Sequence, residues 1–204
     1  MYISIKYIKR CFMKILIYNI KGGQGKTTIA INLALTWGFN LLTNDPLSPV
    51  DSILPTDEVL KLDPDEEFPE LPDEADVIFD MGGYLDIRIK DALKQADYVI
   101  VPVINEYVDV QTTISFLGNL EAYNTNIIII ANKAKKGDCD SITTIMGKFY
   151  PQYPIFELKE SRSMPNVLRE KISVHDMVAQ GGLKKYNYQK VADQFSEIMK
   201  AIKS

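Results

Sequence analysis

The feature that most constrains this chain is a glycine-rich loop between an aliphatic run (residues 14–20) and a segment rich in Ala and Leu (residues 26–37). Three of the four positions from 22 to 25 are glycine. This order predicts a buried strand, a turn and a helix. Glycines let backbone N–H groups converge on one small volume, and the helix directs the positive end of its dipole at the same place. The sequence therefore predicts an anion-binding loop.

Side chains at the start of the predicted helix suit a nucleoside triphosphate with a magnesium ion. Lys26 is a mobile positive charge for the β- and γ-phosphates, the Thr27 hydroxyl is an expected Mg²⁺ ligand, and Thr28 is placed to donate to the α-phosphate. A glycine turn before an ordinary helix is the alternative, and Gly-Lys-Thr-Thr at this junction argues against it. The predicted nucleotide-binding residues of the loop are Gly22, Gly23, Gln24, Gly25, Lys26, Thr27 and Thr28.

The loop departs from the standard phosphate loop, which would have glycine where this chain has Ile20. The sequence Lys-Gly-Gly-Gln-Gly-Lys-Thr-Thr, with Lys21 at its head, resembles the deviant Walker A motif of the ParA/MinD/Soj family of dimeric nucleotide switches. The resemblance implies a homodimer with ATP sandwiched at its interface, in which Lys21 crosses to the partner's nucleotide phosphates. The catalytic residues it implies are Lys21, Lys26 and Asp45.

Residues 40–46 predict a short buried strand that runs into a turn at Asp45-Pro46. Asp45 is expected at the carboxyl end of that strand, where open α/β sheets bind their ligands. The segment resembles the family's Asp-x-Asp-Pro-Gln switch, whose second aspartate positions the attacking water; Thr43 and Leu47 replace its first aspartate and its glutamine. Aspartate before proline also starts many turns without a catalytic role. A nucleotide-binding protein without turnover is therefore one alternative.

Residues 76–80, Asp-Val-Ile-Phe-Asp, predict another buried strand that ends in an aspartate. The strand resembles a Walker B strand, which implies that Asp80 holds the Mg²⁺ shell through water. Gly83, in the sequence Asp-x-x-Gly, is the candidate donor of an N–H to the γ-phosphate. Prolines and carboxylates between residues 48 and 76 predict a loop or partly ordered connection before this strand.

The choice of base is predicted from residues that follow a later strand, residues 126–131, which leads into Asn132. A guanine-specific site would read Asn-Lys-x-Asp, because guanine needs an acceptor carboxylate, and Lys135 stands at that position. ATP is therefore favoured over GTP, with Asn132 available to the adenine edge. The resemblance implies that the loop after residues 154–158 closes over the base, with Lys159 and Glu160 as its walls.

The whole chain, 204 residues of which 46% are hydrophobic, suits one α/β domain. Alternating strands and helices predict a mostly parallel twisted sheet with helices on both faces. The resemblance of the loop implies that this sheet belongs to a P-loop NTPase of the deviant Walker A type. This domain is expected to cover residues 13–204, after a flexible extension, residues 1–12, with no room for the helix-turn-helix domain of larger ParA proteins. No apolar run reaches the roughly 18 residues that span a bilayer, and two distant cysteines indicate a reducing cytoplasm.

Charge is unevenly distributed along the chain. Residues 1–80 hold 7 Lys and Arg against 13 Asp and Glu, a net of −6, whereas residues 123–204 hold 13 against 8, a net of +5. A solvated face explains such an excess as readily as a binding surface does. The candidate DNA-binding residues in the basic part are Arg162, Arg169, Lys171, Lys184 and Lys185.

The resemblance implies an ATPase of plasmid or chromosome partition. ATP closes the dimer, the dimer binds non-specific DNA of the nucleoid, and a ParB-like centromere-binding protein stimulates hydrolysis to ADP and phosphate. A MinD-like ATPase that cycles on a membrane or positions a cargo is an alternative, although Asp193 and Glu197 interrupt any basic face of the last predicted helix, residues 186–202, so no stable membrane association is expected. A NifH-like reductase is a further alternative, and only Cys139 lies in the body of the domain.

Overall fold

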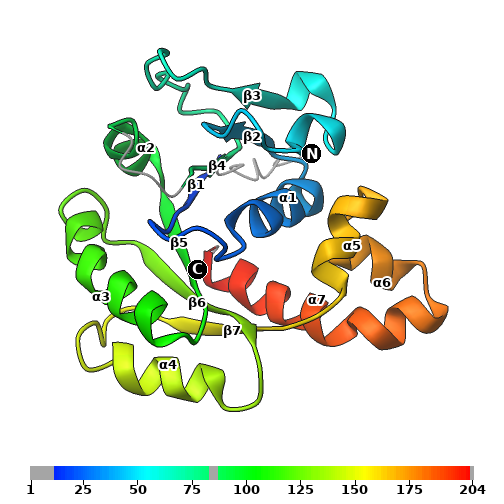
Figure 1. Cartoon of the computed structure of the whole chain (residues 1–204). Coiled ribbons are helices and arrows are strands. Elements are labelled where there is room, and N and C mark those ends of the chain that lie inside the picture. Colours follow the sequence, from blue (N-terminus) through cyan, green and yellow to red (C-terminus); the bar gives the residue numbers. More distant parts are fainter. Residues whose placement is uncertain (1–11, 83–86, 203–204) are drawn as a thin grey trace, which may run out of the picture.

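The fold is built on one parallel β-sheet (Figure 1). The computed structural model describes residues 12–82 and 87–202, so the predicted extension is described only at Phe12. Within these ranges the sheet has seven strands, all paired in parallel, which confirms the predicted class. In spatial order they are β3 (Val59–Lys61), β2 (Asn40–Thr43), β4 (Val77–Asp80), β1 (Lys14–Ile17), β5 (Tyr98–Val103), β6 (Ile127–Ala134) and β7 (Ile155–Lys159).

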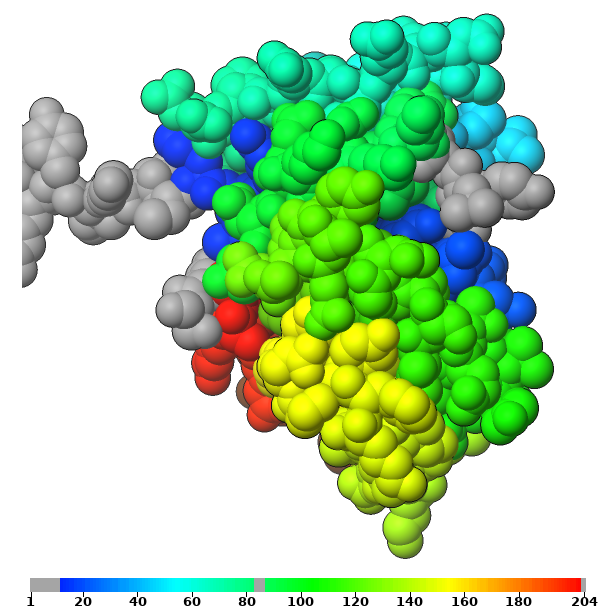
Figure 2. Space-filling view, turned by 90° about the vertical axis from the view of Figure 1, so that its left-hand side faces the viewer, coloured from blue at the N-terminus to red at the C-terminus, as the bar shows by residue number. Residues whose placement is uncertain are grey.

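Helices cover both faces of the sheet, as Figure 1 shows. Side chains of α2, α3 and α4 form one core with the strands, and those of α1, α5, α6 and α7 form the other. Figure 2 looks onto the first face, where green atoms of α2 and α3 fill the middle. The helices are α1 (Lys26–Trp37), α2 (Ile89–Gln95), α3 (Tyr107–Glu121), α4 (Asp138–Met146), α5 (Ser163–Glu170), α6 (Val174–Ala179) and α7 (Gly182–Ile202).

The central strands are hydrophobic along their whole length because helices cover both of their faces. All four residues of β1 and all four of β4 are buried. Successive side chains alternate between the faces, so Leu16 joins the core under α2 and α3 while Ile15 and Ile17 join the core under α1. Short runs of Ile, Val and Leu are typical of such strands, and this made them predictable.

The carboxyl ends of β1, β2 and β4 meet at one edge of the sheet. The strand register pairs Asp80 of β4 with Ile17 of β1 on one side and with Thr43 of β2 on the other. The glycine-rich loop, the turn after β2 and the end of β4 therefore start at the same level. Open parallel sheets bind their ligands at this edge.

The acidic segment between β2 and β4 is more regular than the predicted loop. It contains two short 3₁₀ helices, Val50–Ser52 and Thr56–Glu58, and the edge strand β3. Phe68 is buried, and its ring meets that of Phe79 edge-on with the ring centroids 5.2 Å apart. A strand of three residues is too short to show a periodic pattern, so the sequence did not reveal it.

After β7 the described chain forms three helices, and residue bounds had been predicted only for the last of them. α7 starts at Gly182, four residues before the predicted start, and runs for 21 residues. Its apolar stripe, including Val191, Phe195 and Ile198, is buried in the core with α1. The stripe is therefore core packing. No helix in residues 12–82 or 87–202 is long and apolar enough to cross a membrane.

Candidate nucleotide-binding site

The glycine-rich loop joins β1 to α1 in a backbone conformation that favours glycine. Gly23 and Gly25 have φ of +77° and +85°. A Cβ at Gly25 would lie 2.4 Å from Nδ2 of Asn132, which donates to the Gln24 carbonyl at 2.6 Å. Glycine at position 25 is therefore required both by its dihedral angle and by the approach of β6. Gly22 is exposed with open space around it.

Lys26 begins α1, and only 8% of its surface is exposed. Its Nζ donates to the Lys21 carbonyl at 3.1 Å, so the side chain folds back over the loop. Burial lowers the pKa of Lys26, while the charges of Asp80 and Asp45 oppose this shift and favour the ammonium form. One lysine and two carboxylates from three different segments are thus close enough to interact at the carboxyl edge of the sheet.

Asp80 ends β4 and is 2% exposed. Burial raises its pKa to about 6, against the opposing effects of a hydrogen bond with the Thr27 side chain and of the Lys26 charge. Its Oδ2 is buried and has no hydrogen-bond partner among the described residues. An unpaired carboxylate oxygen beside a threonine hydroxyl suits a divalent cation, since Mg²⁺ takes oxygen ligands.

Thr27 and Asp80 are the residues that would hold Mg²⁺ at this place. Within the described ranges, no group of three or more His, Cys, Asp or Glu side chains is arranged to hold a metal ion. Mg²⁺ commonly binds through one or two carboxylates and completes its shell with water and substrate phosphates. The site therefore fits a cation that is bound together with a nucleotide.

Replacing Asp80 with asparagine is expected to stabilise the nucleotide-free protein by about 1–3 kcal/mol near neutral pH. Burial raises the pKa of Asp80 from 3.8 to about 6, so the folded state disfavours the ionised carboxylate. The folded protein therefore keeps a proton that the unfolded chain has released, and the ionisation penalty is full above about pH 6 and absent below about pH 4. Asparagine still offers an oxygen to the Thr27 hydroxyl.

Urea unfolding of the wild type and Asp80→Asn at about pH 7.5 and at about pH 4 measures this difference. The stability gap should close in acid. Asp91→Asn, at a half-exposed position of α2 where Lys94 pairs with the carboxylate, is the control and should show no gain of this size. A gap of equal size at both pH values would contradict a buried, ionised Asp80.

Asp45 lies in the turn after β2, close enough to Lys26 and Asp80 to influence the pKa of both. Its carboxylate accepts a hydrogen bond from the Leu47 N–H at 3.0 Å, which is the turn contact typical of aspartate before proline. Thr43, which replaces the family's first aspartate, is buried and accepts from the Asp45 N–H at 3.2 Å. Asp45 thus has a structural role in the turn and also lies near the two buried charges.

Asn44 contributes to the site although no motif singled it out. Its side-chain oxygen accepts a hydrogen bond from the Gly82 N–H at 2.5 Å. A Cβ at Gly82 would lie 3.2 Å from the same oxygen. Asn44 therefore ties the turn after β2 to the end of β4. Gly83, the predicted γ-phosphate donor, lies outside the described residues.

Gln24, one of the predicted nucleotide-binding residues, has its side chain buried within the protein. Nε2 donates to the Asp109 carboxylate at 2.7 Å, and Oε1 accepts from the Ile104 N–H at 2.8 Å. Asp109 also faces Lys21, whose Nζ lies 3.7 Å from the carboxylate. Any contact of Gln24 with a nucleotide must therefore come from its backbone, because Ile104, just after β5, and Asp109 of α3 bind its side chain.

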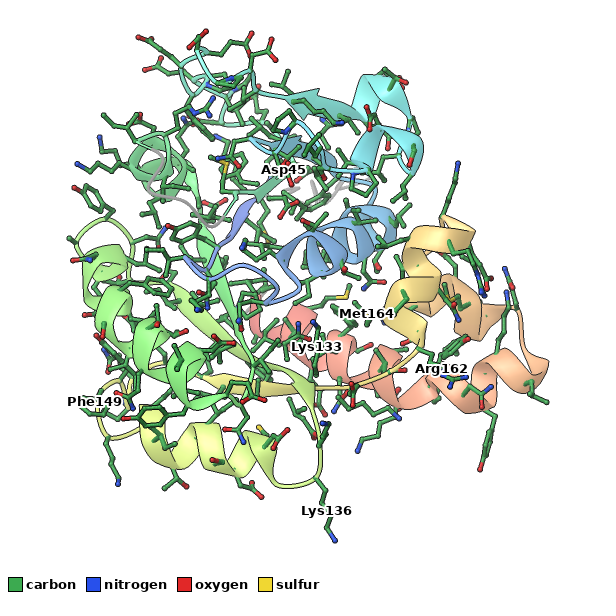
Figure 3. All side chains as sticks on the ribbon, in the orientation of Figure 1. Asp45, Lys133, Lys136, Phe149, Arg162 and Met164 are labelled. Carbon is green, nitrogen blue, oxygen red and sulfur yellow. The ribbon has the colours of Figure 1, made fainter. Side chains whose placement is uncertain are left out.

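A pocket of about 310 Å³ adjoins the loop between α1, β6 and α5. Thr28 and the three residues predicted for the base lie in its lining. Met164, labelled in Figure 3, and Leu168 add an apolar wall from α5, which no sequence pattern indicated. An apolar pocket with a few polar groups suits a heteroaromatic base. The predicted base residues in the lining are Asn132, Lys159 and Glu160.

Lys133 also lines this pocket and contacts the loop. Its Nζ donates to the Gly23 carbonyl at 3.0 Å, and its φ of +51° is unusual for a residue other than glycine. Asn132, one position earlier, binds the loop at Gln24. The end of β6 therefore supports both the loop and the pocket.

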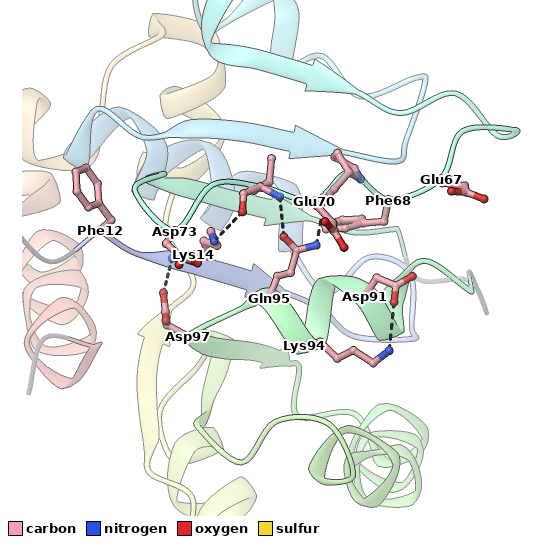
Figure 4. Close-up of a pocket in the computed structure, with 12 residues that line it drawn as sticks. Phe12, Lys14, Glu67, Phe68, Glu70, Asp73, Asp91, Lys94, Gln95 and Asp97 are labelled. Carbon is pink, nitrogen blue, oxygen red and sulfur yellow. Dashed lines mark hydrogen bonds and ion pairs between the residues drawn. The ribbon is translucent and has the colours of Figure 1, made fainter.

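A larger cavity, of about 1120 Å³, lies elsewhere. Lys14, the first residue of β1, and Asp97, which precedes β5, line it, so it lies at the opposite edge of the sheet (Figure 4). Gln95 of α2 bonds the Leu71 N–H and the Pro69 carbonyl there, each at 3.0 Å. The smaller pocket is the better nucleotide candidate, because the glycine-rich loop and the buried carboxylate are at its edge of the sheet.

The five predicted DNA-binding residues lie on or beside α5 and α7. Two of them already pair with Glu170: Lys184 forms an ion pair with its carboxylate, and Arg169 Nη2 lies 3.3 Å from it. These contacts, the Lys184 hydrogen bond first, lower the pKa of Glu170. The other three, exposed and without an ion-pair partner in the part of the chain described, are Arg162, Lys171 and Lys185.

Comparison with known proteins gives matches only among solved structures, since no family model and no curated protein matches the chain. McdA from Cyanothece is 16% identical with a TM-score of 0.66, and the match covers 94% of this chain and 99% of McdA. A candidate plasmid partition protein from Borrelia burgdorferi, bound to AMPPNP, is 16% identical with a TM-score of 0.60 and coverages of 93% and 99%. MinD from Aquifex aeolicus is 17% identical with a TM-score of 0.64 and coverages of 92% and 96%.

A parallel sheet with helices on both faces and a glycine-rich loop between β1 and α1 is the fold of a P-loop NTPase. Within that class, the matched structures cover nearly all of this chain and show the fold of the ParA/MinD-type partition ATPases. At 16–17% identity the likeness establishes the fold, and the activity has to be argued from the site.

Proposed function

We propose that the protein is an ATP-switched, dimeric ATPase of the ParA type that acts in the partition of plasmid or chromosomal DNA. Lys21, at the head of the loop in a ParA/MinD-type fold, is the observation that carries the proposal. Lys26 already supplies a positive charge within its own subunit's loop. A second lysine at the mouth of the loop, 38% exposed, is available to a second subunit.

Each residue of the site has a separate role in the proposed hydrolysis of ATP. Lys26 and the first amides of α1 bind the β- and γ-phosphates. Thr27 and Asp80 would hold Mg²⁺, which would neutralise charge on the phosphate oxygens. Asp45 orients the attacking water, and the partner subunit's Lys21 stabilises the charge that develops on the transferred phosphoryl group.

The matched structures support the choice of nucleotide and cation. Their proteins include a Cyanothece McdA variant in complex with ATP and a MinD from Pyrococcus horikoshii in complex with Mg·ADP. In this chain, Lys135 stands where a guanine-specific site needs a carboxylate. ATP with Mg²⁺ is therefore the proposed ligand.

DNA binding in the ATP state is proposed to come from the basic residues of α5 and α7, doubled by dimerisation, and to place the protein on the nucleoid. Alanine at Lys171 and Lys185 should reduce the log–log salt slope of binding by up to about two units per subunit, since each neutralised phosphate contributes about 0.9. Alanine at Arg169 and Lys184 should change it less, because Glu170 already pairs with both.

Fluorescence polarisation of a labelled duplex of arbitrary sequence, with ATP or ADP across a salt series, measures this effect. Alanine at Lys135 and Lys136, exposed on the turn before α4, is the matched control and should leave the slope unchanged. Equal slopes for all three double variants, or equal binding with ADP, would contradict the proposed surface. A ParB-like centromere-binding protein, added with DNA, is expected to raise the ATPase rate.

A MinD-like role on a membrane is the second candidate, and one surface feature favours it. Leu183 and Tyr186 are 79% and 88% exposed beside Lys184 and Lys185 at the start of α7. Apolar side chains among lysines also suit an anionic lipid surface. ATP-dependent binding to anionic vesicles but not to DNA would select this candidate.

A further inference from the structure

Lys21 is held at both its backbone and its side chain by residues of its own subunit. Its N–H donates to Oδ1 of Asn19 at 2.9 Å, and its Nζ lies 3.7 Å from Oδ1 of Asp109. Asn19 is fully buried, and its Nδ2 donates to the Pro102 carbonyl at 2.8 Å. In the single chain, the lysine assigned to the partner's site is therefore held by Asn19, which is bound to β5, and by Asp109 of α3.

We propose that Asp109 is a positioning residue that holds Lys21 in its own subunit until ATP brings two subunits together. Dimerisation then exchanges the Asp109 carboxylate for the partner's nucleotide phosphates as the counter-charge of Lys21. This inference rests on the proposed function, in which Lys21 acts on the partner's nucleotide. It adds that the Asp109 carboxylate of α3 determines when Lys21 becomes free to contact the partner's nucleotide.

The position of Asp109 is itself fixed by a buried network. Its Oδ2 accepts from Gln24 Nε2 at 2.7 Å, and Gln24 is 1% exposed. Its carbonyl accepts from the Thr113 hydroxyl at 2.8 Å, and that hydroxyl accepts from Asn19 Nδ2 at 3.1 Å. The same network thus contacts the loop at Gln24 and Lys21, so a change in the conformation of the loop alters the contacts of α3.

The ion pair between Lys21 and Asp109 is weak enough to break when the dimer forms. The Asp109 and Lys21 side chains are 17% and 38% exposed, and the closest charged atoms are 3.7 Å apart. Ion pairs this accessible to solvent are weak. A triphosphate carries several negative charges and binds a lysine more strongly than one carboxylate does. The pair therefore biases Lys21 toward its own subunit without preventing the exchange.

Asp109→Asn tests this, because the asparagine oxygen still accepts from Gln24 while the charge that faces Lys21 is removed. Timed acetylation of the nucleotide-free protein, read by peptide mass spectrometry, reports the freedom of the Lys21 amine, with the exposed Lys136 as internal reference. Labelling of Lys21 should rise about two- to fivefold relative to Lys136, as expected for loss of a weak ion pair. An unchanged labelling ratio would overturn the holding contact, whatever the activity of the protein.

The dimer provides the second measurement. Light scattering across an ATP series should show the Asp109→Asn dimer forming at about two- to fivefold lower ATP than the wild type. If the wild type never dimerises but Lys21 labelling is raised in the variant, the proposed function is contradicted, while the ion pair between Lys21 and Asp109 is supported. Raised labelling with no shift in the ATP needed for dimerisation would overturn the holding role.

Simple repulsion between Asp109 and the nucleotide would also favour ATP in the variant. The double variant Lys21→Ala/Asp109→Asn separates the two effects, because no lysine is left to hold. ATP affinity of the double variant should equal that of Lys21→Ala alone. A gain in affinity in the absence of Lys21 would show repulsion and overturn the proposal.

Discussion

Replacement of Lys26 by alanine is expected to weaken Mg·ATP binding by about 10- to 100-fold, the effect of removing a charged hydrogen-bond donor from a buried phosphate site. Lys26 is largely buried over the loop, between the loop carbonyl of Lys21 and the carboxylates of Asp80 and Asp45. Few other positive charges reach this depth, and water cannot replace the lysine there without loss. The buried carboxylate of Asp80 and the exposed carboxylate of Asp45 would then oppose the triphosphate.

Isothermal titration calorimetry of Mg·ATP with wild type, Lys26→Ala and Lys136→Ala measures this effect. Lys136 points away from the body of the protein in Figure 3 and is exposed, so its variant should bind as wild type does. The melting temperatures should be similar, because the alanine variant loses a desolvated charge rather than an apolar contact. Wild-type affinity in Lys26→Ala would show that the loop does not bind the nucleotide.

Replacement of Lys21 by alanine is expected to leave Mg·ATP affinity within about threefold of wild type and to reduce turnover by at least about 100-fold, in line with positive charges supplied in trans to phosphoryl transfer. Lys21 lies at the rim of the loop and points to Asp109, whereas Lys26 folds over the loop of its own subunit. Loss of Lys21 therefore removes the positive charge that would contact the partner's nucleotide. It leaves Lys26 and the phosphate-binding loop of its own subunit intact. The variant should also fail to dimerise with ATP.

Calorimetry, light scattering with ATP and a phosphate-release assay separate these effects. Lys136→Ala is the control, since Lys136 is exposed and lies outside both the loop and the lining of the pocket. It should retain ATP-dependent dimerisation. An ATP-dependent dimer of Lys21→Ala with wild-type turnover would contradict the role of Lys21 in trans.

The parts of the site predicted from sequence are those encoded locally. A strand, a glycine-rich loop and a helix follow one another within 24 residues, so position in the chain gave position in space for Gly25, Lys26 and Thr27. Asp45 and Asp80 were predictable because each follows a short aliphatic run, and parallel strands bring such ends to one edge. Burial on both faces made these strands recognisable.

The supporting contacts could not be predicted, because they join segments far apart in sequence. Gln24 and Asp109 are 85 residues apart, and Asn132 and Gln24 are 108 apart. Nothing in the sequence around Asp109 distinguishes it from a solvated residue in the first turn of a helix. Met164 and Leu168 were missed for a similar reason: an apolar residue of α5 can face the core or a ligand, and only the packing of α5 beside α1 decides.

Sedimentation velocity of the wild-type protein without nucleotide, with Mg·ADP and with a non-hydrolysable ATP analogue tests the central claim most directly. The account predicts a 23.1 kDa monomer in the first two states and a doubling of the mass with the analogue. The analogue prevents turnover, so a short-lived ATP state cannot hide the dimer. The same mass in all three states, whether monomer or dimer, would contradict an ATP-switched dimer.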